Sequence, residues 1–351
     1  MDKDLANTEL PKKKKRRRLW IWIPSVILLG LLCSGLYIGS KMMSYKHVPL
    51  HATDAELGIQ PISSQKGTTD TKLLPSPSAT PSEGKILNIA LFGIDNRSED
   101  ERGRSDTMII LTLDFQLHKI KLTSLMRDLW VPIDSHGFGK LNAAYAYGGP
   151  KLAIKTINQV FGTDIRNYVS VDFFVLEKVI DLIGGIPMDI KPEEIKIINQ
   201  YINEISAIQK KEPVHLTNSG TQSLNGIQAV AFSRVRYVGN GDFERTERQR
   251  RVLKAIEEKV NSMGAAKIPS LLMQVMPDVE TSLSQSELLS LGYQYFQDGS
   301  MTTEEERFPI DGSWKAGRSD AGAWIMKVDL GEIREQAQHY IYDNVKPSLS
   351  R

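Results

Sequence analysis

The arrangement of apolar and polar positions divides the chain into regions of different character. Positions 19–40 form one uninterrupted apolar run without a charged residue. From about position 85 onward, short apolar runs alternate with segments in which apolar residues recur every three or four positions. The first pattern is typical of a membrane-spanning helix, and the second predicts strands alternating with helices. The expected fold class of the globular part is therefore α/β, with a central mixed β-sheet covered by helices.

Run length and the residues that end each run give the expected elements. Short apolar or alternating runs predict strands, and helical spacing with Pro near the start or Gly after the end predicts helices. The predicted strands are 86–93, 107–113, 119–125, 166–171 and 187–190. The predicted helices are 150–161, 173–183, 192–211, 223–232, 244–263 and one that runs from a Ser284–Glu287 capping box to Phe296.

The apolar run at 19–40 is long enough to cross a bilayer, since a helix rises 1.5 Å per residue and a hydrocarbon core is about 30 Å thick. The run KKKKRRR at 12–18 precedes it, and positive residues stay on the cytoplasmic side. We therefore predict a single-pass protein of the cell membrane, with a cytoplasmic basic tail at 1–18, a transmembrane helix at 19–40 and an extracytoplasmic body. A cleaved signal peptide is the main alternative, but the apolar run is long for one.

Positions 41–84 are predicted to be a flexible extracytoplasmic linker. They end in a Pro/Ser/Thr run, PSPSATPS at 75–82, which cannot bury a core. The folded domain is then expected at 85–345. This linker would hold the domain a modest distance from the membrane surface.

Charge and motif content exclude several classes of protein. The net charge of +2 conceals a basic tail, because residues 1–18 hold eight Lys and Arg against three Asp and Glu. The remaining body is mildly acidic, so no nucleic-acid partner is predicted. The chain has no HExxH, Walker or GxSxG motif, which argues against a zinc hydrolase, a Walker-type nucleotide enzyme and a serine hydrolase. Cys33 is the only cysteine, so no intramolecular disulfide is possible.

Positions 232–251, FSRVRYVGNGDFERTERQRR, use arginine to the exclusion of lysine. Guanidinium groups grip phosphate or carboxylate with two parallel hydrogen bonds, which ammonium groups do not. One interpretation is a pocket for a multiply charged anion, most simply a diphosphate. The other is a solvated, salt-bridged helix face, since Glu244 and Glu247 lie among the arginines. The arginines are Arg234, Arg236, Arg245, Arg248, Arg250 and Arg251.

Acidic residues follow or begin two strands that are expected to be neighbours. Asp95 follows the first strand and Asp106 begins the second, so both are expected at one end of the sheet. Two carboxylates there can hold Mg²⁺ together with phosphate oxygens and water. The alternative is that Asp95 is a turn residue and Asp106 a strand-start cap. Arg127 with Asp128 ends the third strand, either as a structural ion pair or with the arginine directed at a ligand.

Seven segments, in order, resemble the LytR-CpsA-Psr family of cell-envelope proteins. The resemblance covers about residues 85–260 well. The predicted membrane anchor and outward-facing domain also fit the family. The segments are LFGIDNR at 91–97, RSDTMII at 104–110, SLMRD at 124–128, KLNAAYAYGG at 140–149, NYVSVDF at 167–173, IDLIGGI at 180–186 and RVRYVGNGDFERTERQR at 234–250.

The resemblance implies a membrane-anchored phosphotransferase. Such a protein attaches a polyprenyl-diphosphate-linked glycopolymer, of the teichoic acid or capsule type, to peptidoglycan through a phosphodiester. By position in the motifs, Asp95 and Asp106 are expected to bind Mg²⁺, and Asp242 to lie near the reacting phosphorus. Either Asp106 or Asp242 is the candidate general base. The diphosphate clamp is expected to consist of Arg104, Arg127, Arg234, Arg236, Arg245 and Arg248, with Gln249 beside it.

The resemblance also implies a hydrophobic tunnel for the prenyl chain, between the sheet and the helices. Two positions depart from the family pattern, with Glu244 where Gly is common and Arg250 where Gln is common. These departures keep two other functions open, a non-catalytic regulator that binds prenyl-linked glycans and a pyrophosphatase that acts on the lipid diphosphate. The candidate tunnel lining is Val169, Val171, Phe173, Phe174, Leu176, Val179, Ile180, Leu182 and Ile183.

Overall fold

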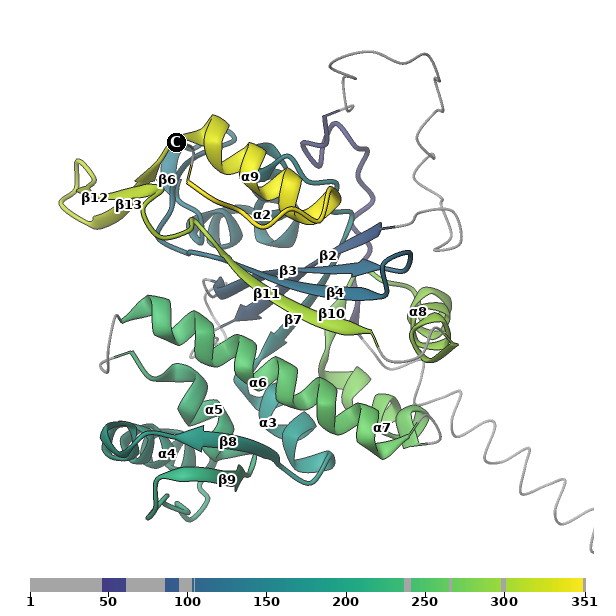
Figure 1. Cartoon of the computed structure of the whole chain (residues 1–351), viewed down its shortest axis with the longest axis vertical. Coiled ribbons are helices and arrows are strands. Elements are labelled where there is room, and N and C mark those ends of the chain that lie inside the picture. The colour runs from purple at the N-terminus through teal and green to yellow at the C-terminus, as the bar shows by residue number, and fades with distance from the viewer. Residues whose placement is uncertain are drawn as a thin grey trace, which may run out of the picture. The chain divides into compact units, whose positions relative to one another are not determined.

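A seven-stranded mixed sheet lies between two layers of helices (Figure 1). The computed structural model describes residues 46–60, 86–94, 103, 105–236, 241–264, 267–297 and 301–349. The predicted tail at 1–18, the predicted transmembrane helix at 19–40 and the site residues Asp95 and Arg104 lie outside these ranges. Within them, no helix has the length and apolar character needed to cross a membrane.

The middle of the sheet is an antiparallel meander, and its flanks are added from distant parts of the chain. Strand β3 pairs antiparallel with both β2 and β4, β7 runs parallel to β2, and β11 runs parallel to β4. The order is β1-β10-β7-β2-β3-β4-β11. The bounds are β1 Lys46–His47, β2 Ile86–Ile94, β3 Ser105–Asp114, β4 Lys119–Leu125, β7 Asn167–Asp172, β10 Glu280–Thr281 and β11 Thr302–Phe308.

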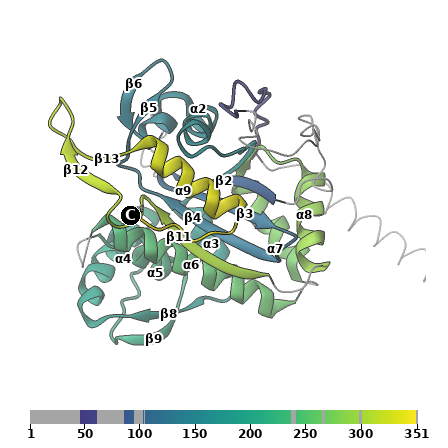
Figure 2. The ribbon, with the colours of Figure 1, turned by 45° about the horizontal axis from the view of Figure 1, so that its top comes forward.

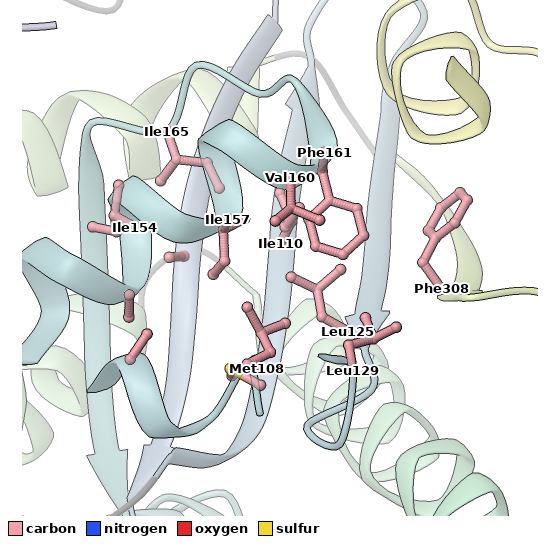
Figure 3. Close-up of a cluster of buried hydrophobic side chains, with 14 of the residues drawn as sticks. Met108, Ile110, Leu125, Leu129, Ile154, Ile157, Val160, Phe161, Ile165 and Phe308 are labelled. Carbon is pink, nitrogen blue, oxygen red and sulfur yellow. The ribbon is translucent and has the colours of Figure 1, made fainter. Parts of the chain in front are cut away.

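Helices α2 (Ala143–Phe161) and α9 (Leu330–Tyr342) cover one face of the sheet (Figure 1). Because side chains alternate along a strand, apolar residues at alternating positions of β2 and β3 enter this core, including Phe92 and Ile110. Figure 3 shows Ile110 among its neighbours. Helix α2 ends at Gly162, whose φ of 66° is the left-handed conformation that glycine adopts readily. Non-helical angles at Gly148 and Gly149 interrupt α2 before the predicted segment 150–161.

The opposite face carries the remaining helices and a second core. Helices α3, α4, α5 and α6 pack with the β8–β9 hairpin, and the buried residues between them form a separate hydrophobic cluster. Helices α7 and α8 lie toward the other end of the sheet (Figure 1). The bounds are α3 Phe173–Leu182, β8 Ile186–Ile190, η1 Pro192–Glu194, α4 Ile195–Gln209, β9 Gly220–Leu224, α5 Gly226–Arg234, α6 Asp242–Met263, α7 Ile268–Val275, η3 Met276–Asp278 and α8 Gln285–Gln297.

Two further hairpins lie at one end of the molecule (Figure 2). They are β5 (Trp130–Ile133) with β6 (Gly137–Lys140), and β12 (Trp314–Arg318) with β13 (Trp324–Val328). A bridge between Leu129 and Met326 joins them, and the Met326 amide donates to the Asp128 carbonyl at 2.9 Å. The second hairpin is therefore fixed to the chain immediately after β4.

The α/β class and the central mixed sheet are confirmed, as is the capping box of Ser284 and Glu287, whose side chains bond each other's backbone amides. The predicted helix at 223–232 is wrong at its start. Ser223 and Leu224 belong to β9, and the helix begins after Asn225, which forms a capping box with Gln228.

The linker prediction for 41–84 is wrong for residues 46–60. Strand β1 adds to the edge of the main sheet, and Leu57 is buried in the core beside α2. Arg166 binds Asp54 through two hydrogen bonds of 2.9 Å, which fixes this segment to the start of β7. The segment lacks helical or alternating spacing, so its pattern resembled a tether although a few apolar side chains are enough to dock it.

Candidate functional site

Four segments bring charged side chains to one end of the sheet. Because β3 and β4 are antiparallel, the start of β3 lies beside the end of β4, so Asp106 and Arg127 meet. Arg236 lies just after α5, and Asp242 is the first residue of α6. Arg245 lies one turn further along α6, on the same side of the helix as Asp242.

These five residues form one ion-pair network, which we term the central cluster. Asp106 Oδ1 accepts from Arg127 Nη1 at 2.7 Å, and Asp106 Oδ2 accepts from Arg236 Nη2 at 2.8 Å. Arg127 Nε also donates to Asp242 Oδ2 at 3.1 Å. Arg236 Nε and Arg245 Nε lie 3.6 Å and 3.5 Å from Asp242 Oδ1. Two carboxylates thus hold three guanidinium groups side by side, which favours the anion-pocket interpretation of the arginines.

Burial and charge act in opposite directions in the central cluster. Burial raises the pKa of Asp106, but the neighbouring charges of Arg127, Arg245 and Arg236 outweigh it, so the pKa is below its ordinary value. The pKa of Arg245 is lowered to about 10, because burial and the charges of Arg127 and Arg236 together outweigh the attraction of Asp242 and Asp106. Arg245 is 2% exposed, and its buried Nε has no hydrogen-bond partner among the described residues. A bound anion would supply a hydrogen-bond acceptor for this guanidinium.

The depressed pKa of Asp106 predicts a contribution to acid stability. A carboxyl whose pKa is lowered on folding stabilises the protein above its ordinary pKa of 3.8, and this stabilisation is lost as pH falls through the folded-state pKa. We expect the free energy of unfolding of the parent to fall more steeply below about pH 4 than that of the Asp106→Asn protein. Urea unfolding between pH 2.5 and 7 measures this, and equal slopes would contradict the prediction.

A pocket of about 360 Å³ opens beside the central cluster. Arg234 is held at its wall, with its guanidinium 5.2 Å from the Phe173 ring and 4.9 Å from the Tyr201 ring, and it donates to Glu204 at 3.0 Å. Helix α4 contributes Ile197, Gln200, Tyr201 and Glu204 to the lining. The lining is Asp106, Phe173, Ile197, Gln200, Tyr201, Glu204, Arg234, Arg236, Arg245 and Gln249.

Arg248 does not line this pocket. Its side chain is 3% exposed and binds Glu194 through Nε at 2.9 Å and through Nη2 at 2.7 Å. Nη2 also donates to Glu244 at 2.9 Å, and Nη1 donates to the Val235 carbonyl at 3.3 Å. Arg248 therefore ties α6 to the start of α4, which is a structural role in the described conformation. Sequence reasoning missed Glu194, because nothing in its local pattern distinguishes it from a solvated helix-start acid.

Other residues of the segments that resemble the family have structural partners. Asp128 binds Lys140 at 2.5 Å and lies 3.5 Å from Arg127, whose shorter contacts are with Asp106 and Asp242. Tyr145 packs on Phe92 with ring centroids 5.1 Å apart. Arg250 is buried against Glu305 at 3.2 Å.

The residues present fit Mg²⁺ only together with an anionic ligand. Among the described residues, no group of three or more His, Cys, Asp or Glu side chains is placed to hold a metal ion. Mg²⁺ commonly takes one or two protein carboxylates and fills its other positions with phosphate oxygens and water. Each Asp106 oxygen accepts one close guanidinium hydrogen bond, which leaves lone pairs for a cation.

On the face of the sheet opposite α2 and α9, several apolar side chains remain only partly buried. They include Leu91, Leu111 and Leu253 in one cluster, and Val171, Val179 and Leu182 in another, with Val169 shared by both. Of the other candidate tunnel residues, Phe173 and Leu176 pack on the second core, and Ile180 and Ile183 are buried in it. Phe174 is 45% exposed.

The profile of the LytR_cpsA_psr family matches residues 59–338. The chain belongs to this family. The regulatory protein MsrR of Staphylococcus aureus (strain Mu50) is 28% identical over 280 residues, which is 79% of this chain and 80% of MsrR.

Two further proteins are similar to this chain, one by sequence and one by structure. A polyisoprenyl-teichoic acid–peptidoglycan teichoic acid transferase, TagU of Bacillus cereus, is 25% identical over 316 residues, covering 89% of this chain and 93% of TagU. The structure of TagT bound to LI-WTA superposes with a TM-score of 0.59 at 25% identity, covering 78% of this chain and 94% of TagT. The family predicted from the sequence and the α/β class with a central mixed sheet are thus confirmed.

Proposed function

We propose that this family member is a cell-envelope transferase that moves a glycopolymer from a polyprenyl diphosphate carrier to peptidoglycan. The observation that carries the proposal is the central cluster, in which Arg127, Arg236 and Arg245 converge beside an open pocket. The name of TagU and the bound LI-WTA of TagT support the same chemistry. The reaction joins the phosphorus next to the glycopolymer to a sugar hydroxyl of the acceptor and releases prenyl monophosphate.

The arginines would do most of the catalytic work. In phosphoryl transfer, the protein positions the reacting groups and neutralises charge on the phosphate oxygens. Arg236 and Arg245 line the pocket and would hold the diphosphate with Arg234, and Arg127 would stabilise the developing charge beside Asp242. Mg²⁺, held by Asp106 and the phosphate oxygens, would neutralise further charge. Arg104 is proposed to belong to the diphosphate clamp, and Asp95 to the metal site.

The general base is proposed to be Asp242. Asp106 accepts hydrogen bonds from Arg127 and Arg236 and is already proposed to hold Mg²⁺. Asp242 is the other carboxylate of the central cluster, and its neighbour Phe243 lies outside the pocket lining. Asp242 would take the proton of the acceptor hydroxyl as the new phosphorus–oxygen bond forms.

The prenyl chain is proposed to lie along the partly buried apolar sheet face that contains Leu91, Leu111 and Val171. Removing this apolar surface from water on binding is favourable, by about 25 cal/mol per Å². The carrier is itself a membrane lipid, so the proposed transmembrane helix at 19–40 and cytoplasmic tail at 1–18 would keep the domain close to its donor.

Metal removal tests the proposal directly. The full-length protein in detergent is supplied with a short prenyl-diphosphate-linked saccharide and uncross-linked peptidoglycan, and mass spectrometry follows both products. We expect a phosphodiester-linked conjugate that requires Mg²⁺, is lost on chelation with EDTA and returns when Mg²⁺ is restored. Hydrolysis without acceptor would instead indicate a pyrophosphatase. Transfer that is equally fast in EDTA would contradict the metal assignment.

A regulator is the second candidate, because a relative of similar identity carries the name regulatory protein MsrR. A regulator without catalysis would bind the donor tightly and form neither conjugate nor hydrolysis product. The same assay separates the two functions, provided that donor binding is measured in parallel by isothermal titration calorimetry.

A further inference from the structure

A row of aromatic side chains leads from the central cluster to the protein surface. Phe243 directly follows Asp242 at the start of α6, and its ring centroid lies 5.3 Å from that of Trp314. Trp314 lies 6.2 Å from Trp324 in an edge-on arrangement with an interplanar angle of 75°. The Arg307 guanidinium lies 4.4 Å from the Phe243 centroid. The outermost ring, Trp324, is 40% exposed.

The β12–β13 register holds this row on one face of a fixed hairpin. Trp314 is paired with Val328 and Arg318 with Trp324, so these four side chains share a face. Val328 packs on the first core, as does the fully buried Met326 two residues earlier. The hairpin is therefore anchored at its base, and the exposure of Trp324 is a property of an ordered strand.

The row lies outside the pocket beside the central cluster. Neither Phe243 nor any residue of β12 or β13 lines the pocket, whereas helix α4 contributes four lining residues. In Figure 1, the start of α6 lies between α4 and the β12–β13 hairpin. In a phosphoryl transfer the attacking oxygen enters roughly in line with the leaving group, from the opposite side. If the pocket takes the donor diphosphate, the row lies where the acceptor enters.

The chemistry of the row suits a saccharide. Aromatic faces are electron-rich and pack against the C–H groups on the faces of pyranose rings. Arg318, across from Trp324, can bind acidic groups that accompany a peptidoglycan strand. We propose that Phe243, Trp314 and Trp324 form a binding track for the glycan strand of the acceptor, with Trp324 as its outermost stacking residue. This inference rests on the proposed function, which supplies the acceptor.

Replacement of Trp324 tests the track. In the transfer assay with full-length protein, we expect Trp324→Ala to raise the KM for uncross-linked glycan strands about tenfold, because one stacking contact is lost. The KM for the donor and kcat at saturating acceptor are expected to change little. Trp324→Tyr is expected to keep most of the acceptor affinity. Tyr293→Ala is the matched control, since Tyr293 is an exposed aromatic residue of α8 outside the track.

The possible outcomes test the binding track and the transferase function separately. An unchanged acceptor KM in Trp324→Ala would overturn the track and leave the transferase intact, and so would a rise confined to the donor KM. If the parent protein transfers nothing, the proposed function fails, and calorimetric titration with glycan strands alone decides the track. Binding about tenfold weaker in Trp324→Ala than in the parent and in Tyr293→Ala would then support it, and equal binding would overturn it.

Discussion

The Arg127→Ala protein is expected to transfer glycopolymer about 10²- to 10³-fold more slowly than the parent, as is typical when one preorganised donor to a developing anion is removed. Arg127 alone makes short contacts with both carboxylates of the central cluster, at 2.7 Å to Asp106 and 3.1 Å to Asp242. Its removal leaves the negative charges of both aspartates less neutralised, which increases their repulsion of the donor diphosphate. Single-turnover rates with saturating donor and acceptor measure the effect.

Two variants make this prediction specific. Arg127→Lys keeps the positive charge but loses the planar fork that reaches two carboxylates at once, so we expect it to recover only part of the rate. Arg251→Ala is the matched control, because Arg251 lies on α6 and donates to the Asp189 carbonyl, away from the pocket lining. Parental transfer by Arg127→Ala, or an equal loss in Arg251→Ala, would remove Arg127 from the proposed mechanism.

The positions of site residues could be predicted best where charged side chains lie at the ends of strands. Asp106 and Arg127 flank apolar strands whose antiparallel pairing follows from the short connection between them, so their meeting could be predicted. Arg236 and Arg245 were singled out by the arginine-rich run that lacks lysine, and Gln249 by the resemblance to the family. The structure brings the two arginines into the central cluster and all three residues into the pocket lining.

Features that depend on contacts between distant segments were not predictable. Strand β11 contains three consecutive glutamates and lacks an apolar alternation, yet it pairs with β4 along its whole length because Glu304 binds Lys119 and Glu305 binds Arg250. Helix α4 forms a pocket wall although its sequence shows only an ordinary amphipathic helix. In each case the partner lies dozens of residues away, and helical or strand spacing carries no information about it.

The buried ion pair between Arg248 and Glu194 illustrates the same limit and gives the second large prediction. The residues are 54 positions apart, and their side chains are 3% and 1% exposed. Glu194→Leu is expected to lower the free energy of unfolding by about 3–5 kcal/mol, because it leaves the guanidinium of Arg248 buried without its main counter-charge. Urea unfolding followed by circular dichroism measures this loss.

The double variant Glu194→Leu/Arg248→Met decides whether the pair acts through charge compensation. When both charges are replaced by apolar groups, no unpaired ion remains, and we expect most of the lost stability to return. Recovery would be incomplete, since Glu194 also accepts from the Lys191 amide at 2.9 Å and Glu244 would lose its bond to Arg248. A double variant as unstable as Glu194→Leu alone would contradict charge compensation.

The same variants decide between two roles for Arg248, because a clamp residue and a structural residue fail differently. If Arg248 gripped the diphosphate, Arg248→Ala would weaken donor binding and leave the free energy of unfolding nearly unchanged. The observed partners of Arg248 predict instead that Arg248→Ala lowers the free energy of unfolding, because Glu194 is then buried without its counter-charge. Helix α4 would then shift at its start, and Gln200, Tyr201 and Glu204 would move with it. We therefore expect donor affinity in the double variant to recover together with stability, although it lacks the arginine.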